Sequence, residues 1–232
     1  MEGELRLGVL ASHGGTNLQA IIDACKDGRL DAEVAVVISN NSKSMAIKRA
    51  GNAGLPVFHL SGATHPQPSL EDVELRAILD KHDVELVVLA GYMKLLGPAT
   101  LAAYRNRVLN SHPALLPKFG GRGMYGTRVH EAVVKAGESM SGVTIHLVDE
   151  QYDHGAAVDQ CSVPVLKTDA VGDLEEKVKN RERLFWIEVL RKIASGEINL
   201  DDLATSAVPE HLNSKILKPG PGRCQQDRYD GT

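Results

Sequence analysis

Short apolar runs alternate with segments of helical spacing along the first half of the chain. The runs are nearly continuous in apolar residues, as expected of strands covered on both faces, and lie at residues 5–11, 34–39, 56–60 and 84–90. Helical spacing follows at residues 18–25, 45–50 and 69–82. This alternation predicts an α/β fold with a doubly wound, mostly parallel sheet, in which residues 84–90 form a central strand.

The second half of the chain continues the pattern with more polar strands. We predict a strand ending at residues 107–112, a helix at 127–136, strands at 142–148 and 157–165, and a final helix from about Asp169 to Ser195. Pro164 places the last strand at the sheet edge. The pattern therefore predicts a single Rossmann-like domain over residues 1–200 and a polar C-terminal tail over residues 201–232, with few core contacts and partial disorder.

Composition narrows the class of protein. The 232 residues are 43% hydrophobic and 24% charged, with a net charge of -4, which suits a soluble domain and argues against nucleic-acid or membrane partners. No apolar run approaches the ~20 residues that span a bilayer, and no signal peptide is visible. Cys25, Cys161 and Cys224 are widely spaced, which predicts a cytoplasmic protein rather than a disulfide scaffold. No metal-binding spacing of His, Cys and carboxylates emerges.

The stretch from Asn110 to Pro117 is the strongest candidate for chemistry. Asn110 and His112 are two residues apart at a strand end and therefore point to the same side, while Pro113 and Pro117 stiffen the segment. An amide can stabilise a developing oxyanion, and an imidazole can hold or move a proton. The alternative is a polar strand end closed by a turn, and this spacing alone does not decide between them.

Two further segments lie at the same predicted edge of the sheet. Residues 12–19 follow the first strand as a glycine turn before a helix, an arrangement that aims backbone N–H groups at an anion, although a simple β-to-α turn fits as well. Residues 91–96 follow the central strand and either line a pocket or pack at the start of the next helix. Ligands of doubly wound sheets bind beyond the carboxyl ends of the strands, so this convergence favours an active site.

Two polar residues occupy positions where apolar ones are expected. Glu182 falls on the buried stripe of the last helix, where it either binds ligand hydroxyls or pairs with Arg181 or Arg183. His146 lies on a strand and is interpreted as a packed histidine rather than a ligand.

Four motifs in this order carry a resemblance to a known family. They are Ser12 to Gln19, Ala90-Gly91-Tyr92-Met93, Asn110-Ser-His-Pro-Ala-Leu-Leu-Pro117 and Asp153-His-Gly155. The chain resembles the glycinamide ribonucleotide formyltransferases, folate-dependent enzymes of purine synthesis, from about Leu5 to Leu200. The resemblance implies transfer of a formyl group from 10-formyltetrahydrofolate, as co-substrate, to the amine of glycinamide ribonucleotide, without a metal. The implied partners are small molecules, and the implied state is a monomer or homodimer.

The resemblance also implies residue roles. Asn110, His112 and Asp153 match the catalytic trio, and Glu182 matches the acid that contacts the ribose hydroxyls. The residues implied to hold the substrate phosphate are Gly15, Thr16 and Asn17. Those implied for folate are Tyr92, Met93, Lys94, Leu95, Leu96, Asn110, Asp149 and Asp153. The chain departs from the family pattern at His13, at Pro68 where an arginine often helps to hold folate, at Gly155-Ala156-Ala157, and in a longer glycine loop at residues 120–126.

The expected mechanism is direct attack of the amine on the formyl carbon. Asn110 and a protonated His112 would donate hydrogen bonds to the oxyanion, while Asp153 would favour the charged ring and orient it. No covalent enzyme intermediate is expected. The alternatives are a formyltetrahydrofolate deformylase, another amine or aminoacyl-tRNA formyltransferase, and a non-catalytic nucleotide-binding module.

Overall fold

The computed structural model describes residues 3–205. Strands and helices alternate along this part of the chain, as the hydrophobic pattern predicts. In chain order they are β1 Leu5–Leu10, α1 Thr16–Lys26, β2 Ala32–Ser39, α2 Met45–Asn52, β3 Val57–His59, α3 Pro68–Lys81, β4 Leu86–Leu89, α4 Pro98–Ala103, β5 Val108–His112, α5 Thr127–Lys135, β6 Met140–Leu147, β7 Ala157–Pro164, α6 Val171–Ala194 and α7 Leu200–Thr205.

One sheet organises the described residues. Its strand order is β3-β2-β1-β4-β5-β6-β7, with parallel pairing from β3 to β5 and antiparallel pairing of β5 with β6 and of β6 with β7. The α/β class, the central place of β4 and the edge position of β7 are therefore confirmed. The antiparallel pairing places Asn110 opposite His146 and His112 opposite Thr144.

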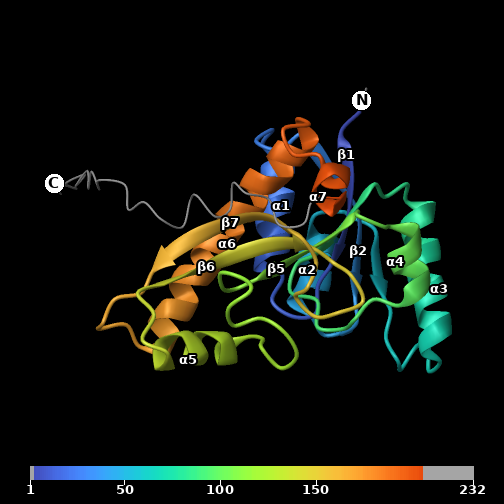
Figure 1. The fold of residues 1–232 in the computed structure, drawn as a ribbon. Helices are drawn as coiled ribbons and strands as arrows, with labels where there is room; N and C mark the ends of the chain where they lie inside the picture. The colour runs from blue at the N-terminus through green and yellow to red at the C-terminus, as the bar shows by residue number, and fades with distance from the viewer. Residues whose placement is uncertain (1–2, 206–232) are drawn as a thin grey trace, which may run out of the picture.

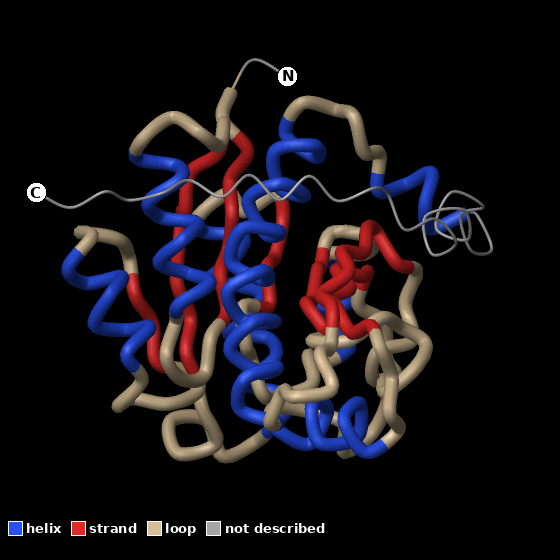
Figure 2. Tube along the Cα trace, turned by 90° about the vertical axis from the view of Figure 1, so that its left-hand side faces the viewer, coloured by secondary structure: helices blue, strands red, loops and turns tan. Residues whose placement is uncertain are grey.

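Helices cover both faces of the parallel strands. Helices α1, α2 and α6 pack on one face in a cluster that includes Leu109, and α3 packs on the other face in a cluster that includes Val108. Figure 1 shows α3 and α4 on one side of the sheet and α1 and α6 on the other, and Figure 2 shows helices in front of the strands from the second side. Alternate residues of β5 therefore face different helices.

Two helices differ in detail from the predicted pattern. Helix α3 begins at Pro68, one residue before the predicted range, and Gln67 is its N-cap. Helix α2 begins at Met45 as the spacing predicts, and it is capped by Ser44, whose Oγ accepts a hydrogen bond from the Ile47 N–H. The short helix α4 was not predicted.

The C-terminal boundary stays a prediction. Helix α7 spans residue 200, where the sequence pattern ends the domain, and Asp201 forms an ion pair with Arg107 at 2.7 Å. The rest of the predicted tail, residues 206–232, lies outside the described residues. Within residues 3–205, no helix is long and apolar enough to cross a membrane.

Candidate active site

The strand order reverses between β1 and β4, and a cavity opens at their carboxyl ends. The loops that leave these strands are joined there: the Ser12 N–H donates to the Gly91 carbonyl at 3.1 Å, and Ser12 Oγ accepts from the Met93 N–H at 2.8 Å. The cavity measures about 890 Å³. Every predicted site residue lines it except Asp149. A switch point of this kind is where doubly wound sheets bind ligands.

One end of the cavity is the N-terminus of α1. Gly15 precedes this helix with a φ of +64°, and a Cβ there would lie 2.8 Å from the Cα of Ala46, so both conformation and space require glycine. No side chain caps the helix. The backbone N–H groups of its first turn and the exposed hydroxyl of Thr16 therefore form a site suited to an anion.

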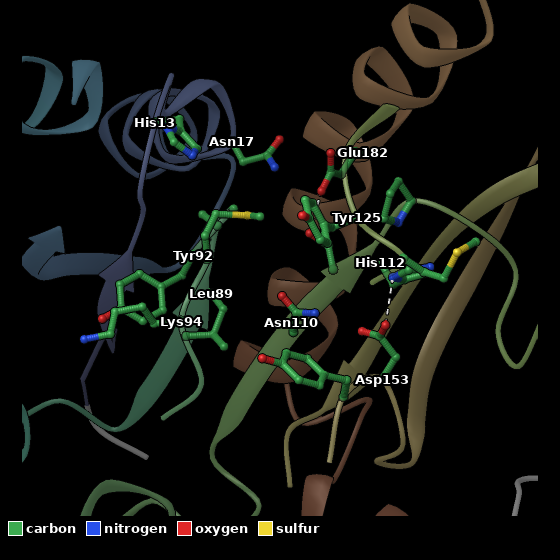
Figure 3. Close-up of a pocket in the computed structure, with 18 of the residues that line it drawn as sticks. His13, Asn17, Leu89, Tyr92, Lys94, Asn110, His112, Tyr125, Asp153 and Glu182 are labelled. Atoms are coloured by element: carbon green, nitrogen blue, oxygen red, sulfur yellow. Dashed lines mark hydrogen bonds and ion pairs between the residues drawn. The ribbon is translucent and has the colours of Figure 1, made fainter. Parts of the chain in front are cut away.

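Asn110, His112 and Asp153 meet at another wall of the cavity (Figure 3). His112 is 3% exposed, and its Nδ1 lies 3.3 Å from Oδ2 of Asp153. Its Nε2 donates to the carbonyl oxygen of Phe119 at 2.8 Å. Both ring nitrogens therefore face oxygen acceptors, an arrangement that a ring protonated on both nitrogens satisfies. Nε2 must exchange the Phe119 carbonyl for the substrate before it can stabilise an oxyanion.

Asp153 is held as a carboxylate in an unusual backbone conformation. Its φ is +53°, a region that Asp tolerates better than most residues, and its Oδ2 accepts the Gly121 N–H at 2.9 Å. Burial acts to raise the pKa of Asp153, but hydrogen bonds from His112 and His146 hold this pKa well below its usual range. Asp153 is thus a permanent negative charge beside His112 at neutral pH.

His146 joins this group, which the sequence analysis did not foresee. Its ring is 2% exposed, and Nε2 lies 3.1 Å from Nδ2 of Asn110 and 3.6 Å from Oδ1 of Asp153. Nδ1 donates to the carbonyl of Leu147 at 2.8 Å, which leaves Nε2 facing both the Asn110 amide and the Asp153 carboxylate. The antiparallel register of β5 and β6 creates this contact, and the chain order alone does not reveal it.

Glu182 lies on α6 between the two ends of the cavity. Its Oε1 accepts a hydrogen bond from the hydroxyl of Ser111. Arg181 instead pairs with Glu188, and Arg183 donates to Asn180, so the alternative of an intrahelical partner for Glu182 was wrong. Burial raises the pKa of Glu182, and hydrogen bonds from Ser111 and Asn17 oppose this rise.

The segment predicted for folate forms a loop at the third wall. Residues 91–97 are irregular, and Met93 and Leu95 are 48% and 49% exposed, so they line the cavity rather than pack in a following helix. Lys94 Nζ forms an ion pair with Glu71 at 2.5 Å.

Asp149 does not line the cavity. Its Oδ2 lies 2.7 Å from Nδ1 of His154, and its Oδ1 accepts the Gln151 N–H, so the carboxylate is turned to its own loop. Gln151, Tyr152 and Asp153 line the cavity from the same loop. A folate contact of Asp149 stays a prediction.

Comparison with known proteins agrees with this geometry. The family described as Formyl transferase matches residues 5–190. The chain belongs to the formyl transferase family. A chloroplastic phosphoribosylglycinamide formyltransferase from Vigna unguiculata is 39% identical over 83% of the chain, which spans 62% of that protein's length. The phosphoribosylglycinamide formyltransferase of Haemophilus influenzae is 34% identical, with 85% of the chain and 91% of that protein covered. The crystal structure of glycinamide ribonucleotide transformylase 1 from Symbiobacterium toebii superposes with a TM-score of 0.78 at 38% identity, covering 84% and 90% of the two chains.

In this member of the formyl transferase family, the glycine loop of residues 120–126 also borders the cavity. Gly121 to Gly126 line the cavity. The guanidinium of Arg128 lies over the ring of Tyr125, 5.0 Å from the ring centroid. The length of this loop is apparent from the sequence, but its position at the cavity is not. Its glycines mark a loop, and only the fold brings that loop over the cavity.

The described cysteines offer no nucleophile at neutral pH. Burial raises the pKa of Cys25 to about 11 and that of Cys161 to about 11, so both remain thiols. Cys224 lies outside the described residues. Within residues 3–205, no group of His, Cys, Asp and Glu is arranged to hold a metal ion.

Proposed function

We propose that the chain transfers the formyl group of 10-formyltetrahydrofolate to the primary amine of glycinamide ribonucleotide. One observation carries this proposal: the Asn110, His112 and Asp153 group shares one cavity with the uncapped N-terminus of α1 and with Glu182. The first group suits acyl transfer, the second suits a phosphate, and a carboxylate between them suits ribose hydroxyls.

The residues of the chain stabilise charge and move protons. The Asn110 amide donates to the formyl oxygen as negative charge develops during amine attack. His112 donates the second hydrogen bond once Nε2 releases the Phe119 carbonyl, and Asp153 balances the positive charge of its ring. Ordered water carries the proton from the amine to the leaving nitrogen.

The remaining walls of the cavity hold and enclose the two substrates. The loop of residues 91–96, with Tyr152 and Asp153 opposite, forms the folate pocket, and Gly15, Thr16 and Asn17 bind the phosphate. Enclosure between these walls holds the amine close to the formyl carbon, an orientation effect worth ~7–11 kcal/mol in favourable cases. We place the protein in the cytoplasm as a monomer or homodimer with small-molecule partners.

An absorbance assay of the folate product tests the reaction. The purified chain is incubated with 10-formyltetrahydrofolate in the presence and absence of glycinamide ribonucleotide. Turnover that requires the ribonucleotide supports the proposal. Release of formate in the absence of the ribonucleotide would indicate a deformylase, a reaction that needs neither the anion site nor Glu182. No reaction in either arm would indicate a binding module.

The anion site has its own test. Glycinamide riboside, which lacks the phosphate, should have a much lower kcat/KM than the ribonucleotide because it makes no contact with the N-terminus of α1. Equal values of kcat/KM for the two amines would remove the phosphate from the proposal. The folate concentration dependence is the internal control, since the folate pocket is unchanged.

A further inference from the structure

Ser111 stands between Asn110 and His112 in sequence but faces the other side of β5. It continues the side of the strand that carries Leu109, towards α1 and α6. Its Oγ donates to Oε1 of Glu182 and lies 3.2 Å from Nε1 of Trp186. Trp186 is fully buried on α6, one turn beyond Glu182.

The chemistry of the three groups assigns each hydrogen. An indole N–H can only donate, so the hydroxyl oxygen of Ser111 accepts from Trp186. The single hydroxyl hydrogen is then directed at the Glu182 carboxylate, which can only accept when ionised. The hydrogen bond from the buried indole therefore fixes the direction of the serine hydroxyl, and that hydroxyl donates to one oxygen of Glu182.

We propose that Ser111 is a positioning residue for the ribonucleotide: its hydroxyl, oriented by Trp186, holds the Glu182 carboxylate in place at the cavity wall. The inference rests on the proposed function in so far as Glu182 binds the ribose hydroxyls. The contact among Ser111, Glu182 and Trp186 is independent of that function and can be measured without substrate.

Charges around Glu182 agree with this role. Asn17 from α1 donates to the same carboxylate, and Lys179 of α6 and His112 of β5 lower the pKa of Glu182 electrostatically. Lys179 is shared with Glu175 through an ion pair at 2.5 Å. Burial raises the pKa of Glu182 and the Ser111 hydrogen bond lowers it, so loss of this bond moves the pKa further up and leaves more protonated acid at neutral pH.

Steady-state kinetics provide the first test, with Ser111→Ala as the variant. A hydrogen bond to a charged group is lost, so KM for the ribonucleotide should rise on the order of tenfold at pH 7, with kcat and KM for the folate within about twofold. The rise should shrink as the pH increases, because Glu182 then ionises without help. Ser111→Thr, which keeps the hydroxyl, should restore most of the affinity.

Ser141→Ala is the matched control, because Ser141 is also a buried serine but its Oγ has no hydrogen-bond partner within residues 3–205. It should behave as the parent protein. A Ser111→Ala protein with the parent KM at every pH, or with a defect that Ser111→Thr shares in full, would overturn the proposal.

Intrinsic fluorescence provides the second test, on the free protein. Trp186 is the one tryptophan of the chain. Its emission should change with pH in a transition that Glu182→Gln removes, and Ser111→Ala should abolish that transition or move it to higher pH. An identical transition in parent and Ser111→Ala proteins, or none that depends on Glu182, would overturn the contact. If the parent protein forms no product from the ribonucleotide, the proposed function fails, and this titration still decides whether Ser111 links Glu182 to Trp186.

Discussion

The last three residues of β5 serve two regions of the site that differ in character. On the face of α3, Asn110 and His112 meet the charged and polar groups of Asp153 and His146. On the face of α1 and α6, Ser111 meets Glu182 and Trp186. The first region suits bond making at the formyl carbon, and the second suits recognition of the ribonucleotide.

The difference follows from the pleat of a strand. Successive side chains point to opposite faces, so three consecutive residues can serve reaction and binding without competing for space. Substitutions on the first face should therefore lower kcat, whereas substitutions on the second should raise KM for the ribonucleotide. Five variants test this division.

The largest effect is expected for His112→Ala. The protein should fold normally but lose about 10²–10³ in kcat, because an oxyanion donor is removed. Asn110→Ala should lose a similar factor. Steady-state assays with saturating substrates measure kcat, and circular dichroism checks the fold. His82→Ala, at the distant C-terminus of α3, is the matched control. A folded His112→Ala protein with turnover close to that of the parent would refute the catalytic assignment.

Glu182→Gln should act on binding instead. The amide cannot replace an ionised acceptor, so KM for the ribonucleotide should rise roughly 10- to 100-fold while kcat changes little. In the parent protein the same KM should rise as the pH falls through the raised pKa of Glu182. Glu188→Gln changes a carboxylate on the same helix that pairs with Arg181 and should leave both parameters unchanged. A fall in kcat alone would contradict the division between the two faces.

Asp153→Asn should lower the stability of the folded protein in a pH-dependent way. Hydrogen bonds depress the pKa of Asp153 in the folded protein. Its ionised form therefore contributes to the free energy of unfolding at pH values above about 3.9, the pKa of Asp in an unfolded chain. This contribution is lost as the pH falls below that value towards the depressed pKa of the folded protein. Urea unfolding at pH 7 should show a loss of about 2 kcal/mol relative to the parent, and the gap should narrow at pH 3. Asp27→Asn removes an exposed ion pair with Arg29 and should change little at either pH. A gap that widens on acidification would be inconsistent with a depressed pKa.

His146→Phe should have the smallest effect. The substitution removes the hydrogen-bond partner of the Asn110 amide and the imidazole that lies beside the Asp153 carboxylate. We therefore expect kcat to fall about tenfold or less, with KM unchanged. His59→Phe on the edge strand β3 is the control. If KM for the ribonucleotide changed and kcat did not, His146 would belong to the other face.

Much of the site could be predicted from the chain because its parts are local. The glycine turn before α1, the stiff segment after Asn110 and a carboxylate on an apolar helical stripe each depend on neighbours within a few residues. His146 shows the limit of such local signals: it is packed as interpreted, but its contact with Asn110 was not predicted. Asp149 matched a family position, and its side chain lies against His154, so its contact with folate stays a prediction.

The sequence by itself determined the order of strands and helices and the family, and it supplied the three residues that we propose as the catalytic trio. These follow from short-range hydrophobic periodicity and from a compact motif. Only the tertiary structure decided that Ser111 touches Glu182 and Trp186, and that His112 faces both Asp153 and the Phe119 carbonyl. Such contacts depend on strand order, on the register of β6 against β5 and on the packing of α6, and the spacing of residues along the chain encodes none of these directly.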